Sequence, residues 1–121
     1  GLGGVRMSEQ HARASAKLIN AVQPEYLATL VLFSRRGNRR VSEGFGGNFT
    51  QLDQRQLFQE MEMFLSDLRL TGTIFRSDHA SNFLVLKGVL NRDLDAMLTQ
   101  LRTAIETPER GFLRQDYQRG L

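Results

Sequence analysis

The sequence predicts an α/β fold of alternating helices and mostly parallel strands, and three features of the chain predict it. Apolar residues recur at the three- and four-residue spacing of a helix in several segments. Between these segments lie short apolar runs of the kind that parallel sheets bury on both faces. The resulting order is helix, strand, long loop, helix, short strand, apolar segment and helix, and such alternation is typical of α/β units.

The first helix and strand are predicted within residues 8–33. Ser8 is a candidate N-cap, small residues such as Ala12 and Ala16 form one helix face, and the helix is expected to stop before Pro24. His11 is expected to be exposed in the first turn of this helix. Residues 26–33 are nearly continuously apolar, which predicts a strand buried on both faces.

A loop rich in arginine and glycine is predicted over residues 34–48, where a packed element is not expected. A second helix follows, capped by Thr50 or Asp53 and running to about Leu70. Its apolar stripe includes the methionines at positions 61 and 63 as core residues, and Glu60 is expected on another face.

The last third of the chain is predicted to hold a short strand and a third helix. Gly72 ends the second helical segment, and residues 73–75 form the strand. The third helix carries apolar residues from Leu94 to Ile105 and ends at Pro108. These strands are too few for a closed sheet, so we expect residues 1–107 to be part of a larger α/β architecture and residues 108–121 to be a polar tail.

Composition limits the class of protein. The chain has 121 residues, which suits one domain or part of a larger one. It has no cysteine, so it offers neither a disulfide nor a thiolate metal site, and we expect a cytoplasmic location. No apolar run approaches the roughly 20 residues of a membrane span. The net charge of +3 is too small to indicate a nucleic-acid partner.

The central stretch, residues 75–90, holds the densest group of polar side chains in an otherwise apolar region. These candidate site residues are Arg76, Asp78, His79, Ser81 and Asn82. They follow the end of a predicted strand, and polar groups at such a position usually face a cleft. The alternative is that Asp78, Ser81 and Asn82 satisfy the backbone groups of a tight turn.

The central string also resembles a known family. Residues 73–88 read Thr-Ile-Phe-Arg-Ser-Asp-His-Ala-Ser-Asn-Phe-Leu-Val-Leu-Lys-Gly, followed by Leu90 and Arg92-Asp93. This string is similar to one that precedes the last helix in a subfamily of radical SAM enzymes. The glycine-rich start at residues 1–4 and the segment from Ser8 to Tyr26 resemble a late barrel strand, helix and next strand of the same group.

The chain departs from the family pattern in several places. Asp78 stands where the family usually has Asn, Phe83 where it has Tyr, and Val85 where Pro is common. The Cys-x-x-x-Cys-x-x-Cys motif, whose thiolates hold the iron-sulfur cluster, is absent. Because that motif lies upstream in the family, and because the first methionine here is Met7, we expect this chain to be the C-terminal portion of a longer enzyme.

The resemblance implies the C-terminal segment of a partial (β/α) TIM-type barrel. Its cofactors would be S-adenosylmethionine and a 4Fe–4S cluster, at the carboxyl ends of the strands. Gly1, Gly3 and Gly4 would lie on the S-adenosylmethionine side, and the five residues of the central stretch would be rim or substrate contacts. No catalytic residue and no metal ligand is assigned.

This interpretation also implies the partners of the chain. We expect it to be inactive alone, to pair with the N-terminal remainder of the same enzyme and a small-molecule substrate, and to self-associate when isolated, because a barrel fragment exposes strand edges.

Two other functions are compatible with the sequence. One is a non-catalytic module that binds an anionic partner through the arginine loop, Arg35, Arg36, Arg39 and Arg40. The other is hydrolysis by Ser81 and His79, although no separate acid is placed by the sequence to orient the imidazole.

Overall fold

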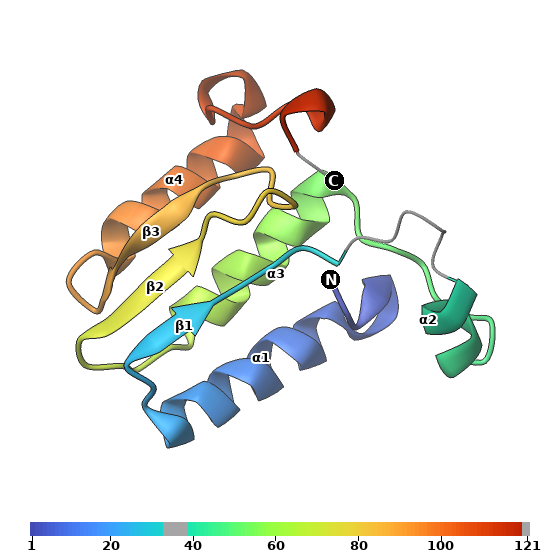
Figure 1. Ribbon diagram of the computed structural model, residues 1–121, viewed down its shortest axis with the longest axis horizontal. Helices are drawn as coiled ribbons and strands as arrows, with labels where there is room; N and C mark the ends of the chain where they lie inside the picture. Colours follow the sequence, from blue (N-terminus) through green and yellow to red (C-terminus); the bar gives the residue numbers. More distant parts are fainter. Residues whose placement is uncertain (33–38, 120–121) are drawn as a thin grey trace.

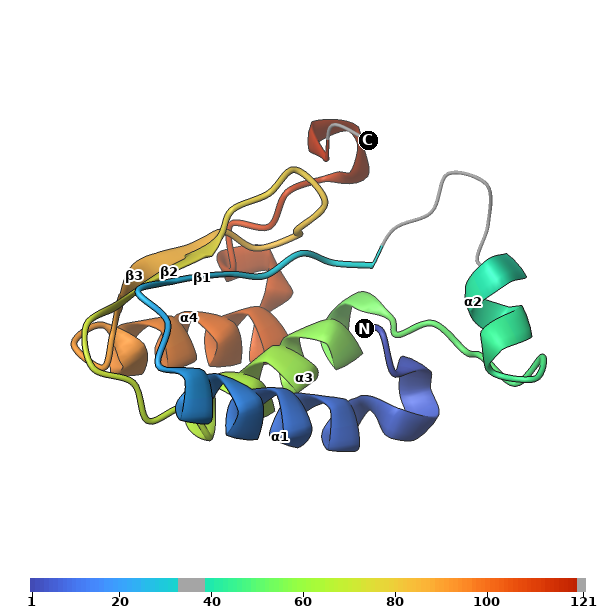
Figure 2. The same ribbon diagram turned by 60° about the horizontal axis from the view of Figure 1, so that its bottom comes forward.

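The protein is described here by a computed structural model that covers residues 1–32 and 39–119. It has two layers, a three-stranded sheet and a layer of helices on one face of that sheet (Figures 1 and 2). The helices in chain order are α1 (Gly4–Val22), α2 (Arg39–Gly44), α3 (Gln54–Ser66) and α4 (Leu94–Glu106). The strands are β1 (Tyr26–Ala28), β2 (Thr73–Ser77) and β3 (Leu86–Leu90). The prediction of a mixed α/β fold is therefore confirmed.

The sheet has the order β1-β2-β3, with one parallel and one antiparallel pair. β1 runs parallel to β2, as expected, and Leu27 lies opposite Phe75. β3 is antiparallel to β2, so the prediction of mostly parallel strands is wrong for this strand. The physical reason is the short connection over residues 78–85, because a parallel crossover needs a dozen or more residues.

β1 is shorter and more exposed than the sequence predicts. It spans Tyr26–Ala28, both end residues are exposed, and Phe33 lies outside the described residues. The expected burial on both faces fails because α1, α3 and α4 cover only one face of the sheet (Figure 2). On the other face Tyr26 is 57% exposed and Ile74 is 42% exposed. We call this the open face.

The core lies between the sheet and the helices. Leu65 of α3, Leu70 after it and Phe75 of β2 are each 0% exposed, and α4 adds Leu101 at 1%. Met61 and Met63 pack against this cluster, which confirms their predicted role.

Local sequence signals explain the limits of α3. Asp53 is its N-cap and forms a capping box, in which its carboxylate accepts from the Gln56 amide and the Gln56 side chain accepts from the Asp53 amide. Asp53 rather than Thr50 is thus the cap. Gly72 has a φ of 78°, which favours glycine and turns the chain into β2.

The first helix differs from its prediction at the N-terminal end. α1 begins at Gly4, with a kink at Met7, and the Ser8 hydroxyl donates to Glu60 instead of capping the helix. His11 is half-buried rather than exposed, because α1 presents it to α3. Glu60 is only 7% exposed, so its expected place on a polar face of the second helix is also wrong.

Both predicted polar segments contain short helices among their described residues. Within residues 34–48 the structure contains α2, none of whose residues is buried. The tail contains two short 3-10 helices, Pro108–Arg110 and Asp116–Gln118. Across the described ranges, no helix has the length and apolar character that crossing a membrane requires.

Candidate functional site

A cavity of about 300 Å³ lies between the sheet and the helices, toward the carboxyl ends of β1 and β2. Its walls are mainly apolar, and they come from every layer of the fold. The lining residues are Gly1, His11, Ala12, Ser15, Ile19, Leu27, Thr29, Leu30, Val31, Leu57, Phe58, Glu60, Met61, Phe64, Ser77, Asn82, Phe83, Leu84, Leu86 and Leu101. A few polar groups in an apolar concavity are typical of small-molecule sites.

Asn82 forms the polar wall on the sheet side. It is 3% exposed, and its side-chain nitrogen donates to the Thr29 carbonyl at 3.0 Å and to the Ser77 hydroxyl at 2.9 Å. Its oxygen accepts from the Val31 amide at 2.8 Å. One buried amide therefore links the segment leaving β1 to the end of β2, and it holds the two parallel strand ends together.

Thr29 supplies a free polar atom at this wall. Its backbone joins β1 to β2 through an amide that donates to the Arg76 carbonyl at 3.0 Å. Its Oγ1 is buried and has no hydrogen-bond partner in the described part of the chain. A buried hydroxyl without a partner costs free energy unless a ligand or water satisfies it.

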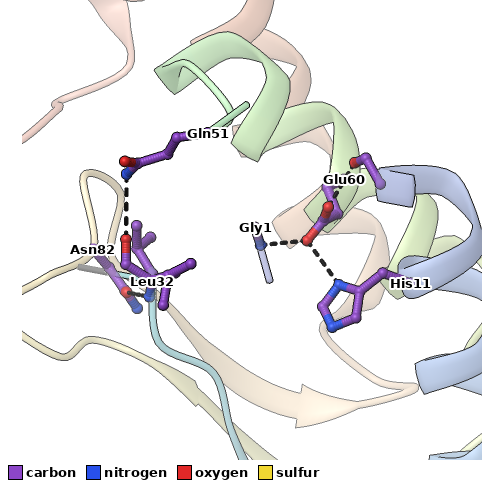
Figure 3. A network of polar contacts seen from close by, with 8 residues as sticks. Gly1, His11, Leu32, Gln51, Glu60 and Asn82 are labelled. Atoms are coloured by element: carbon purple, nitrogen blue, oxygen red, sulfur yellow. Dashed lines mark hydrogen bonds and ion pairs between the residues drawn. The ribbon is translucent and has the colours of Figure 1, made fainter. Parts of the chain in front are cut away.

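Glu60 forms the polar wall on the helix side. Its Oε1 accepts from the Gly1 ammonium at 2.5 Å and lies 3.1 Å from His11 Nδ1, while its Oε2 accepts from Ser8 at 2.5 Å. Figure 3 shows Gly1 and His11 pointing at this carboxylate from different directions. Burial alone would raise the pKa of Glu60, but the hydrogen bonds from Gly1, Ser8 and His11 outweigh it and hold the pKa below its usual value. The carboxylate is therefore charged at neutral pH.

The predicted rim residues do not gather at one point. Asn82 lines the cavity, whereas Ser81 is buried behind it at 2% exposure. Asp78 and His79 are exposed on the loop beyond β2. Arg76 lies on β2 between two inward-facing residues, so it belongs to the open face.

His79 and Ser81 form a local turn contact. The Ser81 amide donates to His79 Nδ1 at 3.1 Å, and Ser81 Oγ lies 2.9 Å from the same nitrogen. The turn interpretation accounts for this pair. Ser81 is buried, and within the described residues the His79 ring is hydrogen-bonded to Ser81 and to no carboxylate, so hydrolysis has no support.

Of the three glycines predicted on the S-adenosylmethionine side, one lines the cavity and two do not. Gly1 lines the cavity. A Cβ on Gly3 would come within 2.8 Å of the Met7 carbonyl oxygen, and one on Gly4 within 2.8 Å of that of Thr50. Close backbone packing within the protein thus accounts for glycine at positions 3 and 4.

The tail contacts the outer side of the connection between β2 and β3, residues 78–85, which we call the polar loop. Arg114 Nη1 donates to the His79 carbonyl at 2.7 Å and to the Asp78 carbonyl at 3.2 Å. Arg119 Nη2 donates to the Ser81 carbonyl at 2.9 Å, and its guanidinium lies 3.5 Å from the centre of the Phe83 ring. Because Phe83 also lines the cavity, the tail supports one of its walls from behind.

The remaining candidates lie elsewhere. Arg35 and Arg36 fall outside the described residues, while Arg39 and Arg40 are exposed on α2, where Arg39 pairs with Glu43 at 3.2 Å. In residues 1–32 and 39–119, no group of three or more His, Cys, Asp or Glu side chains is placed to hold a metal ion.

Sequence reasoning missed Glu60 and Thr29. A signal for Glu60 was present, because it follows Leu57 by three positions and precedes Phe64 by four, which places it on the buried stripe of α3. Nothing in the sequence singles out Thr29, because the lack of a partner for its hydroxyl among the described residues depends on how the chain leaves β1.

Comparisons of the chain with protein-family models, with curated proteins and with solved structures gave no match.

Proposed function

We propose that this chain is the C-terminal segment of a radical SAM enzyme, and that it contributes part of a barrel rim with contacts to S-adenosylmethionine and a small-molecule substrate. One observation carries the proposal. The glycine-rich start and the Arg-Ser-Asp-His-Ala-Ser-Asn string resemble the same family although they are far apart in sequence, and Gly1 and Asn82 line one cavity.

The architecture supports a partial barrel in three respects. The parallel pair β1 and β2 ends at the cavity, and ligand sites in (β/α) barrels lie at the carboxyl ends of the strands. The helices α1, α3 and α4 cover only one face of the sheet, as helices surround a barrel (Figure 2). β1 is an edge strand in the described sheet, so a further strand has a place to pair.

This chain could contact one of the two cofactors, S-adenosylmethionine, but it has no ligand for the iron-sulfur cluster. The sequence has no cysteine, so the thiolates for a 4Fe–4S cluster would come from the remainder of the enzyme. S-adenosylmethionine, when bound, supplies the carbon radical of this enzyme class. The cavity suits part of such a ligand, because it offers Thr29 Oγ1, which has no hydrogen-bond partner among residues 1–32 and 39–119, in the midst of apolar side chains.

The residues of this chain would act by positioning and by excluding water. Phe64, Phe83 and Leu84 line the cavity with apolar surface, which would keep water from a reactive intermediate. Asn82 fixes the distance between the ends of β1 and β2, so that the cavity keeps its shape.

The coding sequence upstream of Gly1 tests this proposal. We expect an open reading frame that encodes a Cys-x-x-x-Cys-x-x-Cys motif. An open frame without that motif would remove the basis for the family assignment. A second measurement is the mass of the isolated chain by analytical ultracentrifugation. The open face and the edge of β1 predict self-association, and a strictly monomeric chain at high concentration would count against a barrel fragment.

A further inference from the structure

We propose that Arg76 and Lys87 bind the phosphate group of a small phosphate monoester on the open face of the sheet. The two side chains belong to neighbouring antiparallel strands, and the register places Arg76 of β2 directly opposite Lys87 of β3. The binding site consists of residues of this chain alone. Only the naming of its ligand as the substrate rests on the proposed function, in which helices surround the sheet and the open face looks into the barrel.

The alternation of side chains along β2 and β3 places both cations on the open face. Arg76 lies between Phe75 and Ser77, which are buried on the helix side of the sheet. Lys87 follows the buried Leu86. Since successive side chains of a strand point to opposite faces, Arg76 and Lys87 lie on the face that no helix covers (Figure 2). Lys87 is exposed and Arg76 is half-buried, so a ligand can reach both.

The two positive charges have no negative partner among the described side chains. The Arg76 guanidinium donates to the neighbouring Phe75 carbonyl at 3.1 Å, and neither cation forms an ion pair with a described carboxylate. Asp78 follows Arg76 by two positions, but it pairs with neither cation. Like charges directly opposite each other on a sheet destabilise it. An anion bound between Arg76 and Lys87 would remove this repulsion.

The charge of the pair favours a phosphate monoester over a carboxylate. A phosphate monoester carries a charge of about −1.5 to −2 at pH 7, which balances two cations, whereas a carboxylate carries a single charge. A guanidinium group also binds phosphate through two parallel N–H donors. In β1 the small Ala28 lies opposite Arg76, so no large side chain of that strand stands beside the cations.

The next row of the open face selects the rest of the ligand. Tyr26, Ile74 and Val89 lie side by side across the three strands. This row is two residues from the cations, or about 7 Å at the rise of a strand. It is apolar, and it carries the exposed Tyr26 ring. A phosphate monoester with an aromatic or apolar body therefore fits the face, with its body over this row.

An NMR titration of the chain compares phenyl phosphate with benzoate, which share a ring and differ in the anionic group. At constant ionic strength we expect at least about tenfold tighter binding of phenyl phosphate, because only the dianion balances both cations with charged hydrogen bonds. The amide signals of residues 74–76 and 86–89 should shift. Added salt should weaken the binding, because the site is open to solvent.

Two variants and one control assign the binding to the pair. Arg76→Gln and Lys87→Gln should each lower the affinity for phenyl phosphate at least about tenfold. Lys17→Gln is the matched control, because Lys17 is the other lysine of the chain and is exposed on α1, in the layer on the opposite face of the sheet. It should bind as the parent chain does. Without ligand, Lys87→Gln should keep or raise the midpoint of urea unfolding, because facing like charges repel.

Equal affinity for phenyl phosphate and benzoate, or unchanged affinity in both variants, would overturn the proposal. A lower urea midpoint for Lys87→Gln would also contradict it, because Lys87 would then have a partner within the protein. A single-stranded oligonucleotide that binds more tightly than phenyl phosphate and shifts the same amides would refute the small-molecule assignment.

The same titration on the longer enzyme of the proposed function tests the naming of the ligand as its substrate. Retained binding of phenyl phosphate there supports it. Loss of binding would refute it, since the remainder of the enzyme would then supply the negative partner. The upstream cysteine motif is read from a coding sequence and not from binding, so this proposal and the family assignment fail independently.

Discussion

Asn82→Ala is expected to destabilise the fold by about 3 kcal/mol. The substitution leaves three groups without their partner: the Val31 amide, the Thr29 carbonyl and the Ser77 hydroxyl. Each net hydrogen bond contributes about 1 kcal/mol, and leaving a buried partner unsatisfied costs at least that much. Asn82 itself is 3% exposed, so water does not replace its amide without entering the site.

Urea unfolding followed by circular dichroism measures this loss. With a slope of about 1–3 kcal/mol per molar urea, the midpoint should fall by roughly 1–3 M. Asn48→Ala is the control, because Asn48 is exposed and its side chain has no hydrogen bond within the described residues. It should stay within about 0.5 kcal/mol of the parent chain.

Asn82→Asp sharpens the test. It keeps the acceptor for the Val31 amide but places an oxygen against the Thr29 carbonyl and buries a charge. Burial would raise the pKa of the new carboxyl group, so the loss relative to the parent chain should be largest at neutral pH and shrink as pH falls through that raised pKa. A loss below about 1 kcal/mol in both variants would refute the assignment of Asn82 as the link between the strand ends.

Three further predictions concern the frame around the site. Asp53→Ala should cost about 1 kcal/mol in urea unfolding through loss of the α3 cap, whereas Thr50→Ala should cost little; the reverse order would contradict the capping box. Asp93 has its pKa lowered to about 2 by the Arg92 side chain and the Val89 amide. The charged Asp93 side chain therefore stabilises the fold at any pH above 3.8, the ordinary pKa of an aspartate. This contribution is lost as the pH falls toward 2. The free energy of unfolding of Asp93→Asn should therefore approach that of the parent chain between pH 3.8 and pH 2. A difference in unfolding free energy that stays constant over this range would contradict the lowered pKa. Arg119→Lys loses the paired donors to the Ser81 carbonyl and the ring contact, so amide exchange of residues 81–84 should accelerate severalfold, and unchanged exchange would mean that the tail does not support the loop.

Helices were more predictable from this sequence than strands. The spacing of Leu94, Leu98 and Leu101 is set within α4 itself, and the Asp53 cap is a local signal, so both elements follow from nearby residues. The burial of residues 26–28 depends instead on what covers the sheet, which local sequence does not encode. The antiparallel direction of β3 follows from the short connection after Ser77, because a parallel crossover needs a dozen or more residues.

The candidate site was only partly predictable, for a related reason. Asn82 was found because polar residues beyond a strand end are conspicuous, yet its partners lie on the segment that leaves β1, far away in sequence. Residue type predicts a polar face for Glu60, because glutamate is rarely buried, whereas its spacing places it with the apolar stripe, where it is 7% exposed. Its partners come from α1 and from Gly1, and only the packing of α1 on α3 brings them together.

The contacts of Arg114 and Arg119 with the polar loop can form only late in the synthesis of the chain. The carbonyl groups of Asp78, His79 and Ser81 are synthesised well before the guanidinium groups that bind them. During synthesis the loop can therefore gain its full set of contacts only after residue 119 has joined the chain. Ligand-binding measurements on this protein should therefore compare chains with and without a purification tag after Arg119, because a tag there would lie next to these contacts.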